Sequence, residues 1–126
     1  MPAKRSNRVY VVDDHPVISA TLAAILSRAG YQAIAFDASQ RAIDAARLFT
    51  PDLLISNIAM PGLTGIELAI RFKNQFPLCK ILLFSGQAQS ADLLIQAQKA
   101  GYDFSVLSKP VYPKDILDRL CSLQTD

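Results

Sequence analysis

The chain of 126 residues has the length of a single domain, and its 51% hydrophobic and 19% charged residues argue against intrinsic disorder. Its formal net charge of +2, without a concentrated basic face, argues against nucleic-acid binding, and no apolar run approaches the ~18 residues of a membrane span. Cys79 and Cys121 lack metal-site spacing and no signal-peptide core is visible, so we expect reduced thiols in a cytoplasmic protein.

Short apolar runs predict five strands along the chain. They lie at 9–12, 32–36, 52–56, 81–84 and 104–107. Apolar residues at helical spacing follow each run and predict helices with buried stripes at 18–29, 43–46, 66–76, 94–100 and 116–123. Asp37 or Ser39 is expected to cap the second helix. Thr64 with Glu67 predicts a capping box at the start of the third.

This regular alternation predicts an α/β fold of one domain. Each return between parallel strands needs a crossover helix, so five strands alternating with five helices form a doubly wound parallel sheet covered on both faces. We place the domain at residues 8–123, with a flexible N-terminal tail at 1–7 and a short C-terminal tail at 124–126.

Polar residues stand at the ends of four of these strands. Asp13 and Asp14 follow the first strand, Asn57 the third, Ser85 the fourth and Lys109 the fifth. Taken singly, each has an ordinary role as a helix cap, a turn residue or a surface lysine. Because parallel strands share a direction, however, all five side chains can meet at one edge of the sheet. Carboxylate and amide oxygens suit Mg²⁺, and a hydroxyl with an ammonium suits phosphate oxygens.

The same residues belong to an ordered set of motifs. The set consists of Val11-Val12-Asp13-Asp14, Pro51-Asp52-Leu53-Leu54-Ile55, Met60-Pro61-Gly62 with Gly65, Ser85, and Lys109-Pro110. Over roughly residues 8–123 the chain resembles the receiver domain of bacterial two-component response regulators. The resemblance implies a (βα)₅ flavodoxin-like fold with strand order 2-1-3-4-5. It also implies phosphotransfer from a histidine kinase to an aspartate at the end of the third strand, with Mg²⁺ held by the acidic pair.

One departure from the family concerns the phosphoacceptor, because the position of the acceptor aspartate is occupied by Asn57. A carboxamide has no comparable negative charge, and its nitrogen is not nucleophilic. Asp52 lies at the other end of the strand, ~16 Å away at ~3.3 Å per residue, and Ser56 points to the opposite face. We therefore predict that the ordinary aspartyl phosphorylation is absent.

The metal site should be weakened by the same exchange. An amide removes one negative charge, worth at most about 4 kcal/mol for a pair ~4 Å apart at an effective dielectric of 20. We expect Mg²⁺ to bind weakly or not at all through Asp13, Asp14 and the backbone carbonyl of Ala59. Lys109, without its usual anionic neighbour, is expected to turn towards Asp14.

A second departure concerns the switch residues. In the family, an aromatic residue three positions before the lysine reports the state of the phosphorylation site. Here that position is Val106, which has no ring to move, whereas Ser85 keeps the place of the other switch residue. Phe104 and Tyr102 are near in sequence but wrongly spaced for this role.

These features favour a pseudo-receiver, by which we mean a receiver-like signalling module that acts through protein contact without aspartyl phosphorylation. The expected partners are a histidine kinase, another signalling protein or a second copy, through the face of the fourth helix, fifth strand and fifth helix. The alternative is a conventional phosphoacceptor receiver carrying an Asp-to-Asn substitution at Asn57. An Asp-dependent phosphatase would need Asp13 or Asp14 as its nucleophile, and the chain has no substrate-specificity insertion, so we predict that it is not an enzyme.

Overall fold

A computed structural model describes residues 7–86, 89–110 and 112–124 of the chain. Five parallel strands form a single sheet in the order β2-β1-β3-β4-β5, as predicted. The strands are β1 (Arg8–Val12), β2 (Gln32–Phe36), β3 (Leu53–Asn57), β4 (Lys80–Ser85) and β5 (Ser105–Ser108). The helices between and after them are α1 (Pro16–Arg28), α2 (Ser39–Leu48), α3 (Gly65–Gln75), α4 (Gln89–Lys99) and α5 (Pro113–Gln124).

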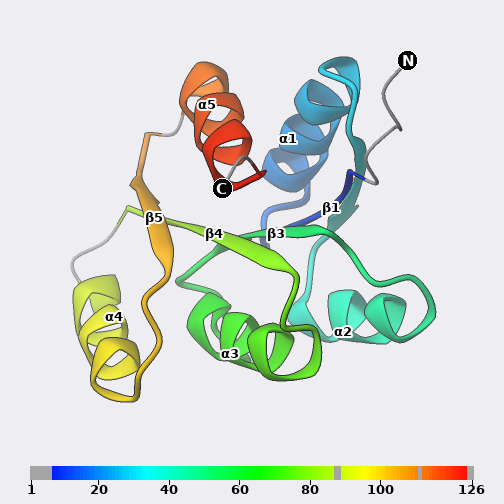
Figure 1. The fold of residues 1–126 in the computed structure, drawn as a ribbon. Helices are drawn as coiled ribbons and strands as arrows, with labels where there is room; N and C mark the ends of the chain where they lie inside the picture. The colour runs from blue at the N-terminus through cyan, green and yellow to red at the C-terminus, as the bar shows by residue number, and fades with distance from the viewer. Residues whose placement is uncertain (1–6, 87–88, 111, 125–126) are drawn as a thin grey trace.

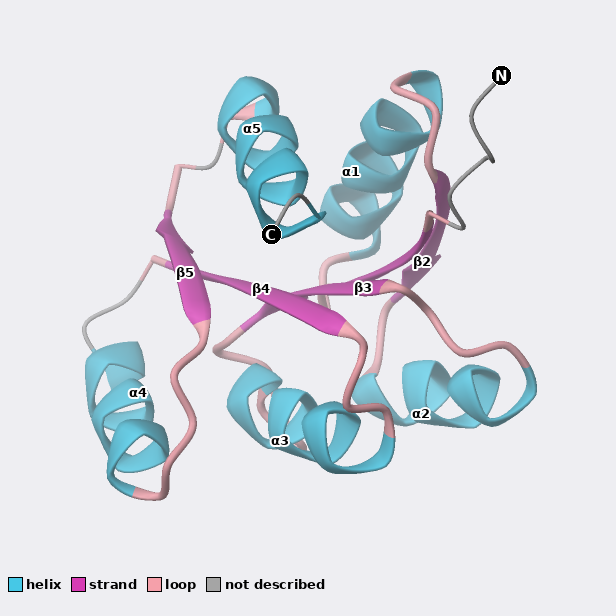
Figure 2. Cartoon of the chain, in the orientation of Figure 1, coloured by secondary structure: helices cyan, strands magenta, loops and turns pink. Residues whose placement is uncertain are grey.

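The helices cover both faces of the sheet (Figure 1). Helices α1 and α5 lie on one face, and α2, α3 and α4 lie on the other, with the strands passing between the two layers (Figure 2). Because successive side chains of a strand point to opposite faces, each strand contributes to both layers. Val9 and Val11 pack in the cluster under α1 and α5, whereas Tyr10 and Val12 pack in the cluster under α2 and α3.

The carboxyl ends of three strands lie one residue beyond the predicted ones. Asn57 and Ser85 are the last residues of β3 and β4, and β5 continues through Ser108. Their backbones pair with neighbouring strands, Asn57 with Phe84 and Ser85 with Ser108, so hydrogen bonding extends each strand beyond its apolar run. Polar side chains therefore end these strands instead of following them.

The prediction that Asp37 or Ser39 caps α2 is wrong. The N-cap residue is Ala38, and no side-chain hydrogen bond caps this helix. The Ser39 hydroxyl instead donates to the carbonyl oxygen of Leu63 at 3.0 Å, and the Asp37 carboxylate lies 3.5 Å from Arg41 Nε. The Ser39 side chain is therefore bound to the loop between β3 and α3, and the Asp37 side chain contacts a residue of α2.

The capping box on α3 is confirmed. The Thr64 hydroxyl accepts from the Glu67 backbone N–H at 3.2 Å, and the Glu67 carboxylate accepts from the Thr64 N–H at 2.9 Å. A cap of this kind stabilises a helix by about 1 kcal/mol. It fixes the start of α3 directly after the turn that leaves β3.

The opposite end of the sheet, where β1 begins, is tied to the segment between α2 and β3. The Asp52 carboxylate accepts from the Arg8 N–H at 2.9 Å, and the Arg8 guanidinium donates to the Thr50 carbonyl at 3.2 Å. The Arg8 guanidinium also lies 5.3 Å from the ring centroid of Phe49, whose carbonyl accepts a hydrogen bond from the buried Tyr10 hydroxyl. We call this set of contacts the base of the sheet.

Both cysteines are free thiols, as expected. Burial raises the pKa of the Cys79 thiol to about 12, so this group stays protonated at neutral pH, whereas Cys121 is exposed. Every helix within the described ranges is too short or too polar to span a bilayer. Most residues of the two predicted tails, namely 1–6 and 125–126, lie outside the residues that the structure describes.

Candidate functional site

The strand register places the predicted site residues along one edge of the sheet. Val12 pairs with Ser56, so Asp13 follows β1 at the level of Asn57. Ser85 is the last residue of β4 and pairs with Ser108, after which the chain continues to Lys109, whose N–H donates to the Ser85 carbonyl at 2.8 Å. We call this carboxyl edge of the sheet the rim. The sequence-based expectation that these residues share one edge agrees with this register.

The acidic pair lies at the end of β1 in contact with His15. The Asp13 side chain is fully buried, and its Oδ1 accepts from the backbone N–H of His15 at 3.0 Å. The same oxygen lies 3.1 Å from His15 Nδ1, and Asp14 Oδ1 lies 3.4 Å from that nitrogen. Asp13 Oδ2 and Asp14 Oδ1 are buried atoms without a hydrogen-bond partner. Unsatisfied carboxylate oxygens of this kind suit a cation.

Asn57 is 4% exposed, and its side-chain amide donates to the carbonyl oxygen of Ala59 at 3.0 Å. This bond closes the first turn of the β3–α3 loop. The buried oxygen atoms of Asp13 and Asp14 fit a divalent cation, but an amide N–H directed at the Ala59 carbonyl does not fit a metal ion at that oxygen. The residues present therefore fit only part of the Mg²⁺ ligand set that the resemblance implies.

Lys109 does not turn towards Asp14. Among the described residues, the carboxylates of Asp13 and Asp14 contact His15 and that of Asp37 contacts Arg41, whereas no carboxylate lies at ion-pair distance from Lys109. The Lys109 ammonium instead lies 5.3 Å from the ring centroid of Phe84, a distance at which a cation is attracted to the ring face. His15 already occupies the position beside the acidic pair that the sequence analysis gave to Lys109.

Val106 is half-buried and packs against the cluster under α2, α3 and α4. Tyr102 and Phe104 contact the same cluster, with their rings stacked at a centroid distance of 5.8 Å. The Tyr102 hydroxyl donates to the Asn74 side-chain oxygen at 3.2 Å, so this ring is held against α3. No aromatic side chain stands at position 106 itself.

Gly65 marks the tightest backbone approach near the rim. A Cβ atom at this position would lie 2.8 Å from the carbonyl carbon of Asn57, 2.9 Å from Ile58 Cα and closer still to the Asn57 oxygen. The Gly65 N–H donates to the Ile58 carbonyl at 2.9 Å. Helix α3 can therefore start against the end of β3 only because this residue has no side chain.

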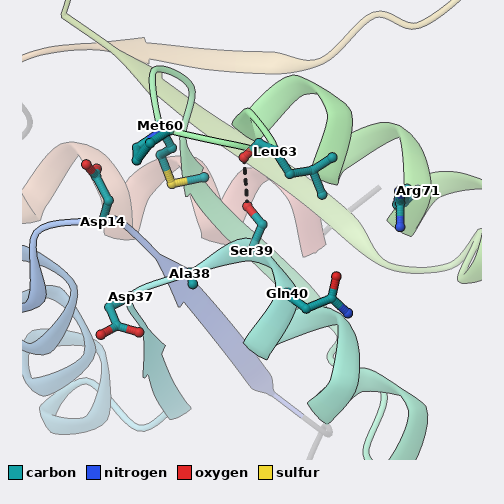
Figure 3. A pocket seen from close by; sticks show the side chains of 9 residues that line it. Asp14, Asp37, Ala38, Ser39, Gln40, Met60, Leu63 and Arg71 are labelled. Atoms are coloured by element: carbon teal, nitrogen blue, oxygen red, sulfur yellow. Dashed lines mark hydrogen bonds between the residues drawn. The ribbon is translucent and has the colours of Figure 1, made fainter.

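Sequence reasoning missed two features of this region. The first is the role of His15, which only its position directly after the acidic pair could have indicated. The second is a cavity of about 300 Å³ beside Asp14, bounded on other sides by Ser39, Met60 and Arg71 (Figure 3). Asp14 and Arg71 lie at opposite ends of the lining side chains in this view, and the Ser39–Leu63 hydrogen bond crosses between them.

Comparison with known proteins places this geometry in a family. Residues 9–121 match the family described as the response regulator receiver domain. The transcriptional regulatory protein FixJ of Bradyrhizobium diazoefficiens is 36% identical over 103 residues, which cover 81% of this chain and 49% of that protein. The chain spans between 21% and 49% of the length of this and two other curated relatives, NtrC of Klebsiella pneumoniae and CreB of Escherichia coli.

Solved structures give the same result. The signal receiver domain of an HD domain-containing protein from Pseudomonas fluorescens superimposes with a TM-score of 0.85 at 26% identity, covering 94% of both chains. The chemotaxis protein CheY4 of Vibrio cholerae superimposes with a TM-score of 0.80 at 27% identity, covering 94% of this chain and 99% of that one. With its fold, its rim of polar residues and a family match that covers nearly its whole length, the chain belongs to the receiver domains of two-component response regulators.

Proposed function

We propose that this receiver domain is a pseudo-receiver, which signals through protein contact and is not phosphorylated on an aspartate. The carrying observation is the buried Asn57 side chain, whose amide donates to the Ala59 carbonyl. A carboxylate has no proton to donate in this way, so the side chain at the end of β3 acts here as a donor within the loop instead of as a nucleophile.

Three groups near Asn57 in sequence or space are poorly placed to replace it as an acceptor. The Ser56 hydroxyl is fully buried and donates to the Asn57 backbone oxygen at 2.9 Å. Asp52 lies at the base of the sheet, where it accepts from the Arg8 N–H. Asp13 is fully buried and contacts His15. Each group is either directed away from the rim or engaged, which supports a domain without acyl-phosphate chemistry and without catalytic activity of its own.

The proposed contact surface is the face of α4, β5 and α5. Ile95 is 48% exposed on α4 and Tyr112 is 60% exposed just before α5. Leu93 and Leu94, which the sequence analysis also placed on this face, pack partly against the core, and Val111 lies outside the described residues. A histidine kinase, another signalling protein or a second copy of the chain would dock here. Neither nucleic acid nor a membrane is proposed as a partner of this domain.

Restoring the acid tests the proposal. We expect the unsubstituted chain to gain no phosphoryl group from a small acyl phosphate with Mg²⁺, because its amide cannot attack phosphorus. Asn57→Asp is the matched variant, and intact-protein mass spectrometry measures the mass increase of one phosphoryl group. Phosphorylation of the unsubstituted chain on a rim residue would refute the proposal.

The same experiment separates the alternative, a conventional receiver that carries an Asp-to-Asn substitution. Robust phosphorylation of the Asn57→Asp variant would show that the rest of the rim still supports the chemistry, which favours this alternative. Failure of a folded Asn57→Asp variant would favour a pseudo-receiver in which Val106 and Lys109, beside Phe84, no longer support the chemistry.

Self-association through the proposed face is a separate prediction. At high protein concentration we expect a dimer in analytical ultracentrifugation, weakened by Ile95→Asp or Tyr112→Asp, because a charge would then be buried in the contact. Leu78→Asp is the matched control, since Leu78 is 91% exposed between α3 and β4, away from this face. A strict monomer would remove the second copy from the partners and leave another signalling protein.

A further inference from the structure

We propose that Asp13, Asp14 and His15 form a binding site for a borderline transition-metal ion of the Zn²⁺ type, in which the imidazole supplies the third protein ligand. Their ligand atoms all lie within 4.8 Å of one another. His15 Nδ1 lies 3.1 Å from Asp13 Oδ1 and 3.4 Å from Asp14 Oδ1. Ligands ~2.1 Å from a central Zn²⁺ are separated by about 3.0–3.4 Å in octahedral or tetrahedral geometry, which agrees with both distances.

A second observation points to a missing cation. The Asp13 side chain is 0% exposed, and its Oδ2 has no hydrogen-bond partner. Asp14 Oδ1 is also a buried atom without a hydrogen bond, since its 3.4 Å approach to His15 Nδ1 has ion-pair distance without hydrogen-bond geometry. Leaving a buried acceptor unsatisfied destabilises the folded protein, and the cost is larger for a charged group. A cation held by both carboxylate oxygens of Asp13 together with Asp14 Oδ1 would satisfy both of these unpartnered atoms.

The donor set favours a borderline metal over Mg²⁺. Mg²⁺ prefers oxygen ligands in near-ideal octahedral geometry and is held mainly by negative charge. Here Asn57 contributes no charge, and its amide proton is directed at the Ala59 carbonyl. Imidazole nitrogen suits zinc, copper, iron and nickel. Replacing one oxygen ligand by His15 nitrogen therefore shifts the preference of this rim away from the metal of the family.

The His15 side chain is accessible for metal coordination. Its side chain is 65% exposed, and among the described residues its Nδ1 contacts the carboxylates of Asp13 and Asp14. Metal coordination uses the Nδ1 lone pair, so the metal would replace the 3.1 Å contact between His15 Nδ1 and Asp13 Oδ1. The hydrogen bond from the His15 backbone N–H to Asp13 Oδ1, at 3.0 Å, holds the Asp13 side chain in place with or without a metal.

The experiment compares Zn²⁺ and Mg²⁺ binding to the untagged chain by isothermal titration calorimetry. All variants carry Cys121→Ser, because Cys121 is an exposed thiol that could also bind zinc. We expect Zn²⁺ to bind at least about tenfold more tightly than Mg²⁺, and His15→Gln to reduce Zn²⁺ affinity by at least about tenfold while changing Mg²⁺ affinity less than about twofold. Circular dichroism verifies that each variant is folded.

Nuclear magnetic resonance gives a second readout, because the sequence contains one histidine. The imidazole proton resonances of His15 should shift on addition of Zn²⁺ and not on addition of Mg²⁺. Unchanged Zn²⁺ affinity in His15→Gln, unshifted imidazole resonances, or preference for Mg²⁺ would each overturn the proposal. These outcomes do not depend on whether the chain is phosphorylated, so this inference and the proposed function can fail separately.

Discussion

Asn57→Asp is expected to bind Mg²⁺ at least tenfold more tightly than the unsubstituted chain. The new carboxylate adds one negative charge beside Asp13 and Asp14, worth at most about 4 kcal/mol at ~4 Å and an effective dielectric of 20. A gain of about 1.4 kcal/mol already gives a factor of ten. The exchange also removes the amide N–H from the Ala59 carbonyl, which leaves that oxygen available as a ligand.

Calorimetric titration with Mg²⁺ measures this effect, and Asn57→Ala is the control. The alanine variant frees the Ala59 carbonyl without adding charge, so it separates the two contributions. If charge dominates, Asn57→Ala should bind Mg²⁺ about as weakly as the unsubstituted chain. Equal Mg²⁺ affinity for Asn57→Asp and the unsubstituted chain would show that the neutral side chain at the end of β3 is not what limits this site.

Gly65→Ala is expected to destabilise the domain by about 3 kcal/mol, at the upper end of the usual cost of overpacking. The added methyl group would collide with backbone atoms of Asn57 and Ile58, which belong to the end of β3 and the turn after it. Backbone in a buried strand cannot move aside as a side chain can. The free energy of unfolding from a urea titration measures the loss.

Gly86→Ala is the matched control for this substitution. The atoms nearest to its added Cβ belong to the Lys109 side chain, at 2.9 Å for Cδ and 3.0 Å for Cβ. Rotation of the lysine side chain relieves the contact with Cδ, and a small shift relieves the contact with Cβ. We therefore expect a loss of about 1 kcal/mol, smaller than at Gly65. If both substitutions lower the free energy of unfolding by similar amounts, the backbone at the contact between α3 and the end of β3 moves more easily than its geometry indicates.

The fold was predictable from the sequence because each level of the pattern agrees with the next. Strand runs such as Val9–Val12 are buried on both faces and alternate with helical stripes, which leaves few topologies. The capping box at Thr64 and Glu67 was equally visible, since its two hydrogen bonds lie within four residues. Local chemistry of this kind requires no knowledge of the tertiary structure.

The predictions from sequence were wrong where tertiary contacts determine the partner of a side chain. Ser39 is an excellent capping residue, but its hydroxyl meets the Leu63 carbonyl, which lies 24 residues away in sequence. Lys109 lies over the ring of Phe84, and Asp14 contacts His15 instead of Lys109. The residues that reach the rim follow from topology, whereas their partners follow from side-chain packing that no periodicity encodes.

The base of the sheet provides a way to separate two kinds of damage. Arg8, Phe49 and Asp52 hold β1 to the segment before β3 at the end of the strands opposite the acidic pair. Substitutions there should lower the melting temperature of the whole domain while the surroundings of Asp13 and His15 stay the same. A set of such variants would show how much ligand affinity falls when only the stability of the domain falls. That loss can then be subtracted from the effect of substitutions at the opposite edge.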